Sequence, residues 1–202
     1  MNIRAKSFSA FTAIAALALS ACAPETSVGA PLSPPLEGAT IGGEFALTSE
    51  DGETVRWTDF DGQYRIVYFG YAYCPDACPT DVQRTMQGFA QFEQSAPELA
   101  AKVQPIFISV DPERDTPEVL TQFTDAFSER MIGLTGTEEQ IADVASKFSV
   151  YYTKFEANEE GGYLMDHSRI SFLFGPDGEP ISMLPHDQGA DAVEAELALW
   201  VS

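Results

Sequence analysis

The chain has 202 residues, a length that predicts one globular domain together with a tail or an anchor. Its content of 45% hydrophobic and 21% charged residues is that of an ordinary soluble protein, and it excludes a coiled coil, a collagen-like chain and a wholly disordered chain. With 31 acidic and 11 basic residues, the formal net charge is −20. Because such a surface repels phosphate backbones, the composition argues against nucleic acid as a partner and favours basic proteins or metal ions.

The first residues have the three parts of a secretory signal. Arg4 and Lys6 lie in a segment without acidic residues, and an apolar run follows at residues 11–19. This run is too short for a transmembrane helix. Residues 19–22 then resemble a bacterial lipobox, in which Cys22 is lipidated and becomes the first residue of the mature chain.

We therefore expect residues 1–21 to be a signal peptide of the lipoprotein type. Prolines among small residues at 22–36 predict an extended Pro-rich tether, and residues 37–202 then form the folded domain. The expected location is the bacterial cell envelope, with the domain anchored to a membrane by lipid and facing the periplasm. Ordinary secretion, or an uncleaved anchor with Cys22 incidental, is the alternative.

The first half of the folded part alternates between strand and helix patterns. Runs rich in β-branched and aromatic residues occur at 44–48, 54–57, 65–71 and 103–110. The first two flank a turn signal and predict a hairpin, whereas the last two are continuous and are typical of strands buried on both faces. Between these two strands Val82, Met86 and Phe89 follow helical spacing, which predicts a helix.

The second half adds two capped helices, a hairpin and a closing helix. Residues 116–118 have the pattern of an N-cap, a first-turn proline and an acid, and they predict a helix that ends near Glu129. Thr137 and Gln140 form a capping-box pattern that opens another helix. Strand patterns follow at 150–155, 169–174 and 180–184, and a last helix at 190–201. This order predicts an α/β domain of three layers, a mixed sheet flanked by helices, with an N-terminal hairpin and an inserted β-hairpin.

Cys74 and Cys78 are the only cysteines left once Cys22 is assigned to the anchor. They lie four residues apart, after the strand at 65–71, where the free N–H groups at the start of a helix stabilise a thiolate. A thiolate binds metal and attacks disulfides. A structural disulfide is the alternative interpretation, but a bridge that closes so small a loop stabilises a fold little.

His167, just before the strand pattern at 169–174, is the third candidate ligand. Two thiolates and one imidazole form a soft donor set that suits Cu(I) and also accepts Cu(II) or Zn(II). Asp111 follows a buried strand, and if that strand is parallel to its neighbour we expect this carboxylate to orient His167 or a partner. Helix capping accounts for residues 115–117, and we expect His186 to be a solvated surface residue.

Three segments together resemble the Sco/SenC family. They are residues 68–80, which contain a CxxxCP element, the SVDPERDTP segment at 109–117, and the DHS triplet at 166–168. The match extends from about Leu36 to Val201. The resemblance implies a thioredoxin-like fold and a membrane-tethered domain that faces the periplasm.

The resemblance also implies a site and a function. Cys74, Cys78 and His167 would hold one copper ion, as Cu(I) or Cu(II), with Asp111 and Asp166 as supporting acids. The implied function is a copper metallochaperone that delivers copper to the binuclear copper site of cytochrome c oxidase. The implied partners are the copper-site subunit of that enzyme, an upstream copper donor, and a thioredoxin-like periplasmic reductant that keeps the thiols reduced.

Two other functions would use the same thiols as a redox-active pair. A thiol–disulfide reductase would keep the copper-site cysteines of the oxidase reduced, with one cysteine attacking a disulfide and the other resolving it. A peroxide-reducing or redox-sensing thiol protein would need one thiol of low pKa and a resolving partner. Neither function needs His167, so the role of this residue separates both of them from the metallochaperone.

Overall fold

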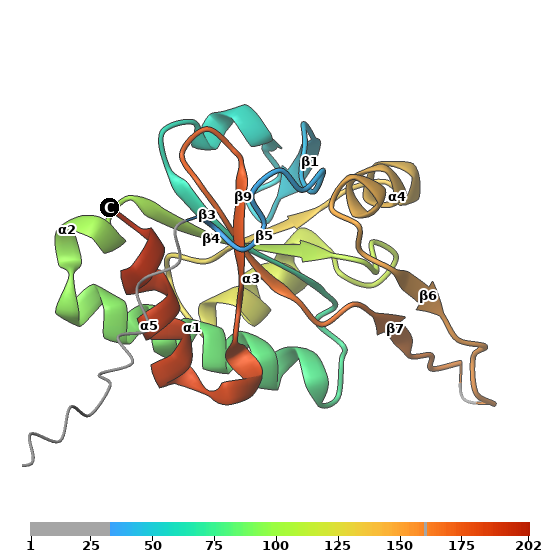
Figure 1. Ribbon diagram of the computed structural model, residues 1–202. Helices are drawn as coiled ribbons and strands as arrows, with labels where there is room; N and C mark the ends of the chain where they lie inside the picture. Colours follow the sequence, from blue (N-terminus) through green and yellow to red (C-terminus); the bar gives the residue numbers. More distant parts are fainter. Residues whose placement is uncertain (1–32, 160) are drawn as a thin grey trace, which may run out of the picture.

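Seven strands form the central sheet of the computed structural model, which describes residues 33–159 and 161–202 (Figure 1). In the order in which they pair, the strands are β2 (Thr54–Arg56), β1 (Ala46–Ser49), β5 (Ile132–Thr135), β4 (Val103–Ser109), β3 (Tyr64–Gly70), β8 (Ser171–Phe174) and β9 (Pro180–Leu184). Strands β3, β4 and β5 run parallel, and the remaining pairs are antiparallel. The sheet is therefore mixed, as the sequence predicts.

Helices cover both faces of this sheet. They are η1 (Trp57–Phe60), α1 (Ala77–Ser95), α2 (Pro97–Ala100), α3 (Pro117–Asp125), α4 (Glu138–Lys147), η2 (His186–Gln188) and α5 (Ala190–Trp200). Helices α1, α3 and α5 lie on one face, and α4 lies on the other (Figure 1). A separate pair of strands, β6 (Tyr152–Lys154) and β7 (Met165–His167), projects from the body of the domain (Figure 1). The predicted three-layer α/β architecture is confirmed.

Aromatic side chains fill the space on both sides of the sheet. On the face toward α1 and α3, Tyr68 stacks on Phe107 at 6.3 Å, and Phe107 contacts Phe123 of α3 at 4.7 Å between ring centroids. On the opposite face, Phe148 at the end of α4 packs against Phe174 at 5.3 Å. Neighbouring positions of β3 and β4 thus point to the same face, as parallel pairing requires.

Local capping signals correctly predict where two helices begin. Thr116 caps α3 by accepting the N–H of Val119, and the reciprocal contacts of Thr137 and Gln140 form the capping box of α4. The end of α3 was less well marked, because this helix stops at Asp125 and not near Glu129.

Two strands are absent from the sequence expectation. Strand β5 has only four residues and contains Gly133, which weakens the strand pattern. A β-carbon at Gly133 would lie 2.9 Å from Leu120 of α3, so close packing of the helix requires the glycine. Strand β7 includes His167, which the sequence places in the connection before a strand.

The chain enters and leaves the domain at the same end of the sheet. Leu36, expected as the last residue of the tether, packs against the core and donates its N–H to the carbonyl of Ile181 in β9 at 2.9 Å. At the C-terminal end, the N–H of Ser202 donates to the hydroxyl of Tyr64, the first residue of β3, at 3.3 Å. Both contacts lie near the start of β3, whereas the cysteines follow its end.

The expected signal peptide, most of the expected tether and the lipidation candidate Cys22 lie outside the described residues. Within residues 33–159 and 161–202, no helix combines the length and the apolar character needed to span a membrane.

Candidate metal centre

The two cysteines lie where the chain turns from β3 into α1. Cys78 is in the first turn of α1 and is fully buried, whereas Cys74 precedes the helix and is half-buried. The backbone N–H of Cys78 points at the sulfur of Cys74 at 3.3 Å, and both thiols are free. Gly70 leaves the space for this turn, because a β-carbon there would lie 2.9 Å from the ring of Tyr68 and 3.2 Å from the Cys78 sulfur.

His167 reaches the cysteines from the end of β7. Its Nε2 lies 3.0 Å from Sγ of Cys78, and its Nδ1 lies 3.0 Å from the carbonyl oxygen of Ser168. Because a carbonyl only accepts, Nδ1 carries a proton toward Ser168, and Nε2 is the ring nitrogen that faces the sulfurs. The rings of Tyr68 and Tyr71 pack edge-on against the imidazole at 6.1 and 6.0 Å, which leaves His167 only 8% exposed.

These three side chains form a donor set of the right chemistry for copper. One donor atom from each of Cys74, Cys78 and His167 lies within 4.8 Å of the other two. Two sulfurs and an imidazole are soft ligands, the class that Cu(I) prefers. The residues therefore fit one copper ion. Since Cys78 and His167 are buried, Cys74 is the ligand that solvent and other molecules reach.

The two thiols differ in their acidity. A hydrogen bond from Cys78 holds the pKa of Cys74 well below its ordinary value despite burial, and the N–H groups of Cys78 and Asp76 act in the same direction. The pKa of Cys78 is raised, because its thiol donates to Cys74 and because it is buried. Cys74 is therefore the thiolate of the pair, and Cys78 must lose a proton when it binds a metal.

A buried carboxylate, that of Asp81, stabilises the turn between β3 and α1. Asp81 of α1 accepts the hydroxyl of Tyr68 at 3.0 Å and both arms of the Arg169 guanidinium at 2.8 and 2.7 Å. Burial opposes ionisation of Asp81, but the hydrogen-bonded guanidinium outweighs it and lowers the pKa of this carboxyl. Nε2 of His186 also faces Asp81 at 3.6 Å. The expectation of a solvated His186 is therefore wrong, because this side chain is buried against Asp81.

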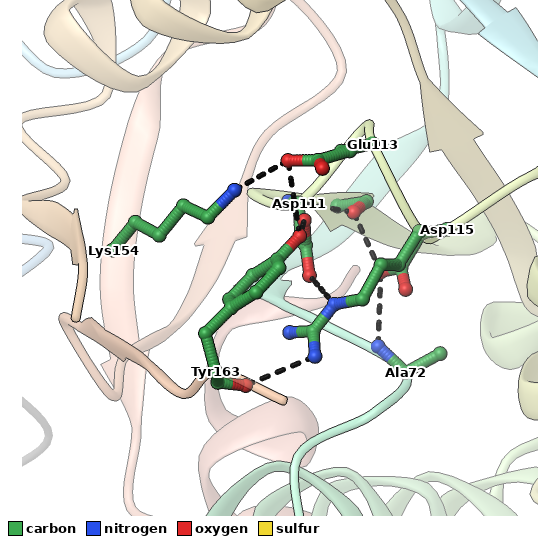
Figure 2. Close-up of polar contacts among 8 residues, drawn as sticks. Ala72, Asp111, Glu113, Asp115, Lys154 and Tyr163 are labelled. Carbon is green, nitrogen blue, oxygen red and sulfur yellow. Dashed lines mark hydrogen bonds and ion pairs between the residues drawn. The ribbon is translucent and has the colours of Figure 1, made fainter. Parts of the chain in front are cut away.

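Asp115 fixes the loop that leads to Cys74. Its carboxylate is fully buried and accepts the hydroxyl of Ser109 at 2.6 Å and the N–H of Ala72 at 2.9 Å (Figure 2). Burial raises the pKa of Asp115 to about 6. Helix capping explains Thr116 but not Asp115, so that part of the expectation is corrected: Asp115 ties the end of β4 to the loop before Cys74.

A cluster of polar residues that we call the latch joins the β4–α3 loop to the segment carrying His167. The latch consists of Asp111, Glu113, Arg114, Lys154 and Tyr163 (Figure 2). The hydroxyl of Tyr163 donates to Asp111 at 2.7 Å, and Nε of Arg114 pairs with the same carboxylate at 2.6 Å. Arg114 also donates to the carbonyl of Tyr163 at 2.9 Å and lies 3.6 Å from the centre of its ring.

The remaining members tie the latch to β6. Lys154 of β6 pairs with Glu113 and lies 3.8 Å from the ring centre of Tyr163. The segment from β6 to β7, which we call the arm, is thereby attached to the body of the domain. Asp111 is buried, whereas Glu113 and Lys154 lie at the surface.

The structure does not place either supporting acid beside the imidazole. Asp111 contacts Arg114 and Tyr163, so its influence on His167 passes through the arm. Asp166 is exposed and alternates with His167 on β7, which directs the two side chains to opposite faces. Asp111 thus does not contact His167 directly, and the carbonyl of Ser168 is the group that faces Nδ1 of the imidazole.

The SCO1/SenC family model matches residues 33–202. The chain belongs to the SCO1/SenC family. It is 46% identical to protein SenC of Rhodobacter capsulatus over 138 residues, which are 68% of this chain and 60% of SenC. It is 36% identical to the human mitochondrial protein SCO1 homolog over 160 residues, which are 78% of this chain and 52% of that protein. This Sco/SenC chain thus spans about half the length of the human relative.

Solved structures agree with this assignment. ScoI of Bradyrhizobium japonicum with copper bound superposes with a TM-score of 0.71 at 34% identity, over 78% of this chain and 98% of ScoI. The thioredoxin domain of a thiol–disulfide oxidoreductase from Bacteroides vulgatus shares the fold alone, with a TM-score of 0.55 at 13% identity over 80% of this chain and 96% of that domain. The thioredoxin-like Sco/SenC prediction is confirmed, and the Cys74, Cys78 and His167 group can hold one copper ion.

Proposed function

We propose that this Sco/SenC protein is a copper metallochaperone that delivers one copper ion to the binuclear copper site of cytochrome c oxidase. The observation that carries this proposal is the convergence of two thiols and an imidazole within 4.8 Å. The copper-bound ScoI relative supports the choice of metal. The resemblance of the CxxxCP, SVDPERDTP and DHS segments to the family supports the oxidase as the destination.

The proposed transfer proceeds by exchange of ligands. Copper binding by Cys74, Cys78 and His167 displaces the proton that Cys78 keeps in the metal-free protein. Three protein ligands leave a coordination position for a donor from the acceptor. Since Cys78 and His167 are buried, the acceptor approaches from the side of Cys74, and the buried pair releases the ion last.

The proposal includes a location and further partners. The sequence pattern of residues 1–22 supports a signal peptide at 1–21 and a lipid anchor at Cys22, with residues 22–36 as the linking segment. The folded domain would then face the periplasm. In that oxidising compartment the two thiols need a thioredoxin-like reductant to stay in the metal-binding form, and an upstream donor supplies the copper.

A second function is favoured by the lowered pKa of Cys74. The Cys74 thiolate would attack a disulfide of the oxidase copper site and form a mixed disulfide, releasing one partner thiolate. Cys78 would then attack the Cys74 sulfur and release the second partner thiol. The partner gains two electrons, and the protein ends with a Cys74–Cys78 disulfide that the external reductant must reduce again.

One titration tests the metallochaperone proposal. Residues 23–202, reduced and kept without oxygen, are titrated with Cu(I) against a competing chelator. We expect one copper per chain, and we expect Cys74→Ser, Cys78→Ser and His167→Ala each to weaken affinity by at least about 100-fold, more than the loss of a residue that only orients a ligand. Asp143→Ala, which changes an exposed residue of α4, is the control and should leave affinity within about threefold.

The same variants distinguish the two functions. A His167→Ala protein that binds copper as tightly as the parent would contradict the ligand assignment. In the reductase, His167→Ala should retain most of its rate of disulfide reduction, whereas either cysteine variant should lose it. Circular dichroism of each variant shows whether the fold is intact.

A further inference from the structure

A groove of about 510 Å³ opens beside the cysteine-bearing turn. The residues that matter for its chemistry are Tyr73, Arg114, Phe155, Glu156, Tyr163 and Leu164. One wall is the turn itself, because Tyr73 directly precedes the accessible ligand Cys74. The other wall is the arm. The groove is therefore adjacent to the candidate metal centre and distinct from its three ligands.

Three large apolar side chains of this groove are open to solvent. Tyr73 is 53% exposed, Phe155 is 53% exposed and Leu164 is 50% exposed. Phe155 and Leu164 belong to the two paired segments of the arm, and the N–H of Phe155 donates to the carbonyl of Leu164 at 2.9 Å. Apolar surface that gathers in this way beside a reactive group is typical of an interaction site.

The side chains that line the groove contact one another. The guanidinium of Arg114 lies 3.6 Å from the ring centre of Tyr163 and 5.2 Å from that of Tyr73, so it connects the two walls. Its charge is paired with Asp111 at 2.6 Å. A partner therefore meets a pre-formed surface, which lowers the entropy cost of association.

The rim of the groove is acidic. Glu156 lines it and Glu159 follows near the tip of the arm, and both side chains are exposed. No ion pair joins either glutamate to another residue in the part of the chain that the structure describes. With a net charge of −20 over the whole chain, this surface is complementary to a basic partner.

We propose that this groove docks the protein that receives the copper. An apolar side chain of the acceptor, flanked by Lys or Arg, fits between Tyr73, Phe155 and Leu164 and places a metal-binding thiolate of the acceptor next to Cys74. The inference rests on the proposed copper transfer. Because the groove is small and its rim is charged, the complex is short-lived and sensitive to salt, as a hand-off requires.

Transfer kinetics test the docking surface. Copper-loaded residues 23–202 are mixed, without oxygen, with the soluble copper-site domain of cytochrome c oxidase from the same organism, and separately with a small Cu(I) chelator. The groove variant carries Phe155→Ser and Leu164→Ser. Its matched control carries Tyr151→Ser and Leu199→Ser, which alter two exposed apolar residues outside the groove. A charge variant carries Glu156→Gln and Glu159→Gln.

We expect the groove variant to transfer copper to the acceptor domain about tenfold more slowly than the parent, the effect typical of losing an interface anchor. The charge variant should be about threefold slower at low salt and should lose most of the salt dependence seen in the parent. The control variant should match the parent. Copper loss to the small chelator should be the same in all four proteins, because none of these substitutions changes a copper ligand.

The outcomes separate the docking surface from the function on which it rests. Equal transfer rates for parent and groove variant would overturn the docking surface while copper transfer stands. If the parent loads copper but passes none to the acceptor, the proposed function fails, and the docking surface fails with it. If sedimentation shows a dimer that the groove variant abolishes while transfer is unchanged, the groove binds a second copy of this chain, and the proposal is again overturned.

Discussion

The cysteines and the histidine of the metal centre are held to the protein in different ways. Cys78 lies in the core, on a turn fixed by the buried carboxylates of Asp81 and Asp115. His167 lies on an arm of two strands with three paired residues each, and the latch attaches this arm to the domain through one buried carboxylate and several more exposed side chains. The cysteine turn is therefore fixed by the core of the domain, whereas the histidine is attached to it through the arm.

This difference predicts where substitutions act. Hydrogen bonds and ion pairs near the surface contribute about 1 kcal/mol or less each, whereas breaking a buried charged network costs several kcal/mol. Changes below the cysteines should therefore reduce the stability of the whole domain. Changes in the latch should displace the histidine while the core stays folded, because a weakly attached segment opens locally.

The largest effect should come from the buried carboxylate under the cysteine turn. Asp81→Ala leaves the hydroxyl of Tyr68 and the ring of His186 without their partner in a buried site, so we expect the free energy of unfolding to fall by about 3 kcal/mol. Urea unfolding at pH 7 measures this change. Asp143→Ala, which removes an exposed ion pair with Lys147, is the control and should cost less than about 0.5 kcal/mol. A loss below about 1 kcal/mol for Asp81→Ala would show that this part of the centre is no more firmly held than the arm.

A smaller effect, visible only as a function of pH, should come from Asp115. Its pKa of about 6 in the folded protein lies above the ordinary value of 3.8, so the folded state holds the proton more tightly than the unfolded state. Stability from this group is therefore greatest below pH 4 and is lost as pH rises from about 4 to about 6, by about 2 kcal/mol. Asp115→Asn keeps an acceptor for Ala72 and Ser109 and removes this loss.

Unfolding of both proteins between pH 4 and pH 7 isolates the Asp115 contribution, since all other carboxylates are shared. The variant should gain about 2 kcal/mol relative to the parent across this range. A stability difference that stays constant with pH would contradict the assignment of a buried, reluctantly ionised carboxylate to the loop before Cys74.

The smallest change in stability should come from the latch. Tyr163→Phe removes only the hydroxyl that donates to Asp111, so we expect a cost of about 1 kcal/mol. Because the arm carries His167, copper should dissociate to a chelator about three to five times faster, a size in the lower range for residues that orient ligands indirectly. Tyr151→Phe makes the same chemical change at an exposed position close to the arm and should alter neither property. If both variants release copper at the parent rate, the latch does not position the histidine.

Short-range signals account for most of the elements that the sequence predicts correctly. The caps at Thr116 and Thr137 and the apolar runs of β3 and β4 depend on neighbouring residues alone. Strand β5 was missed because Gly133 is required by the packing of α3, a reason that lies in a distant segment. Whether these four residues form a strand therefore depends on pairing across the sheet, and the local sequence pattern does not show it.

The same limit applies to the metal centre. Cys74 and Cys78 are recognisable from their spacing. His167 is recognisable because it completes a donor set with the two thiols, and from the family resemblance. By contrast, Arg114 meets Tyr163 49 positions later, and Asp81 meets Arg169 88 positions later, with no periodic pattern to connect them. The residues that could hold a metal ion were predictable from the sequence, whereas the residues that hold them in place required the structure.

The placement of Leu36 and of the C-terminal Ser202 has a consequence for how the domain is oriented. Leu36 and Ser202 both contact the domain near the start of β3, and the seven residues of this strand separate them from the cysteine turn by about 20 Å. A support attached at Ser202 therefore lies at the opposite end of β3 from the cysteines. In a molecule immobilised in this way the cysteine turn faces the solution. Partners can therefore reach the cysteines without contacting the support.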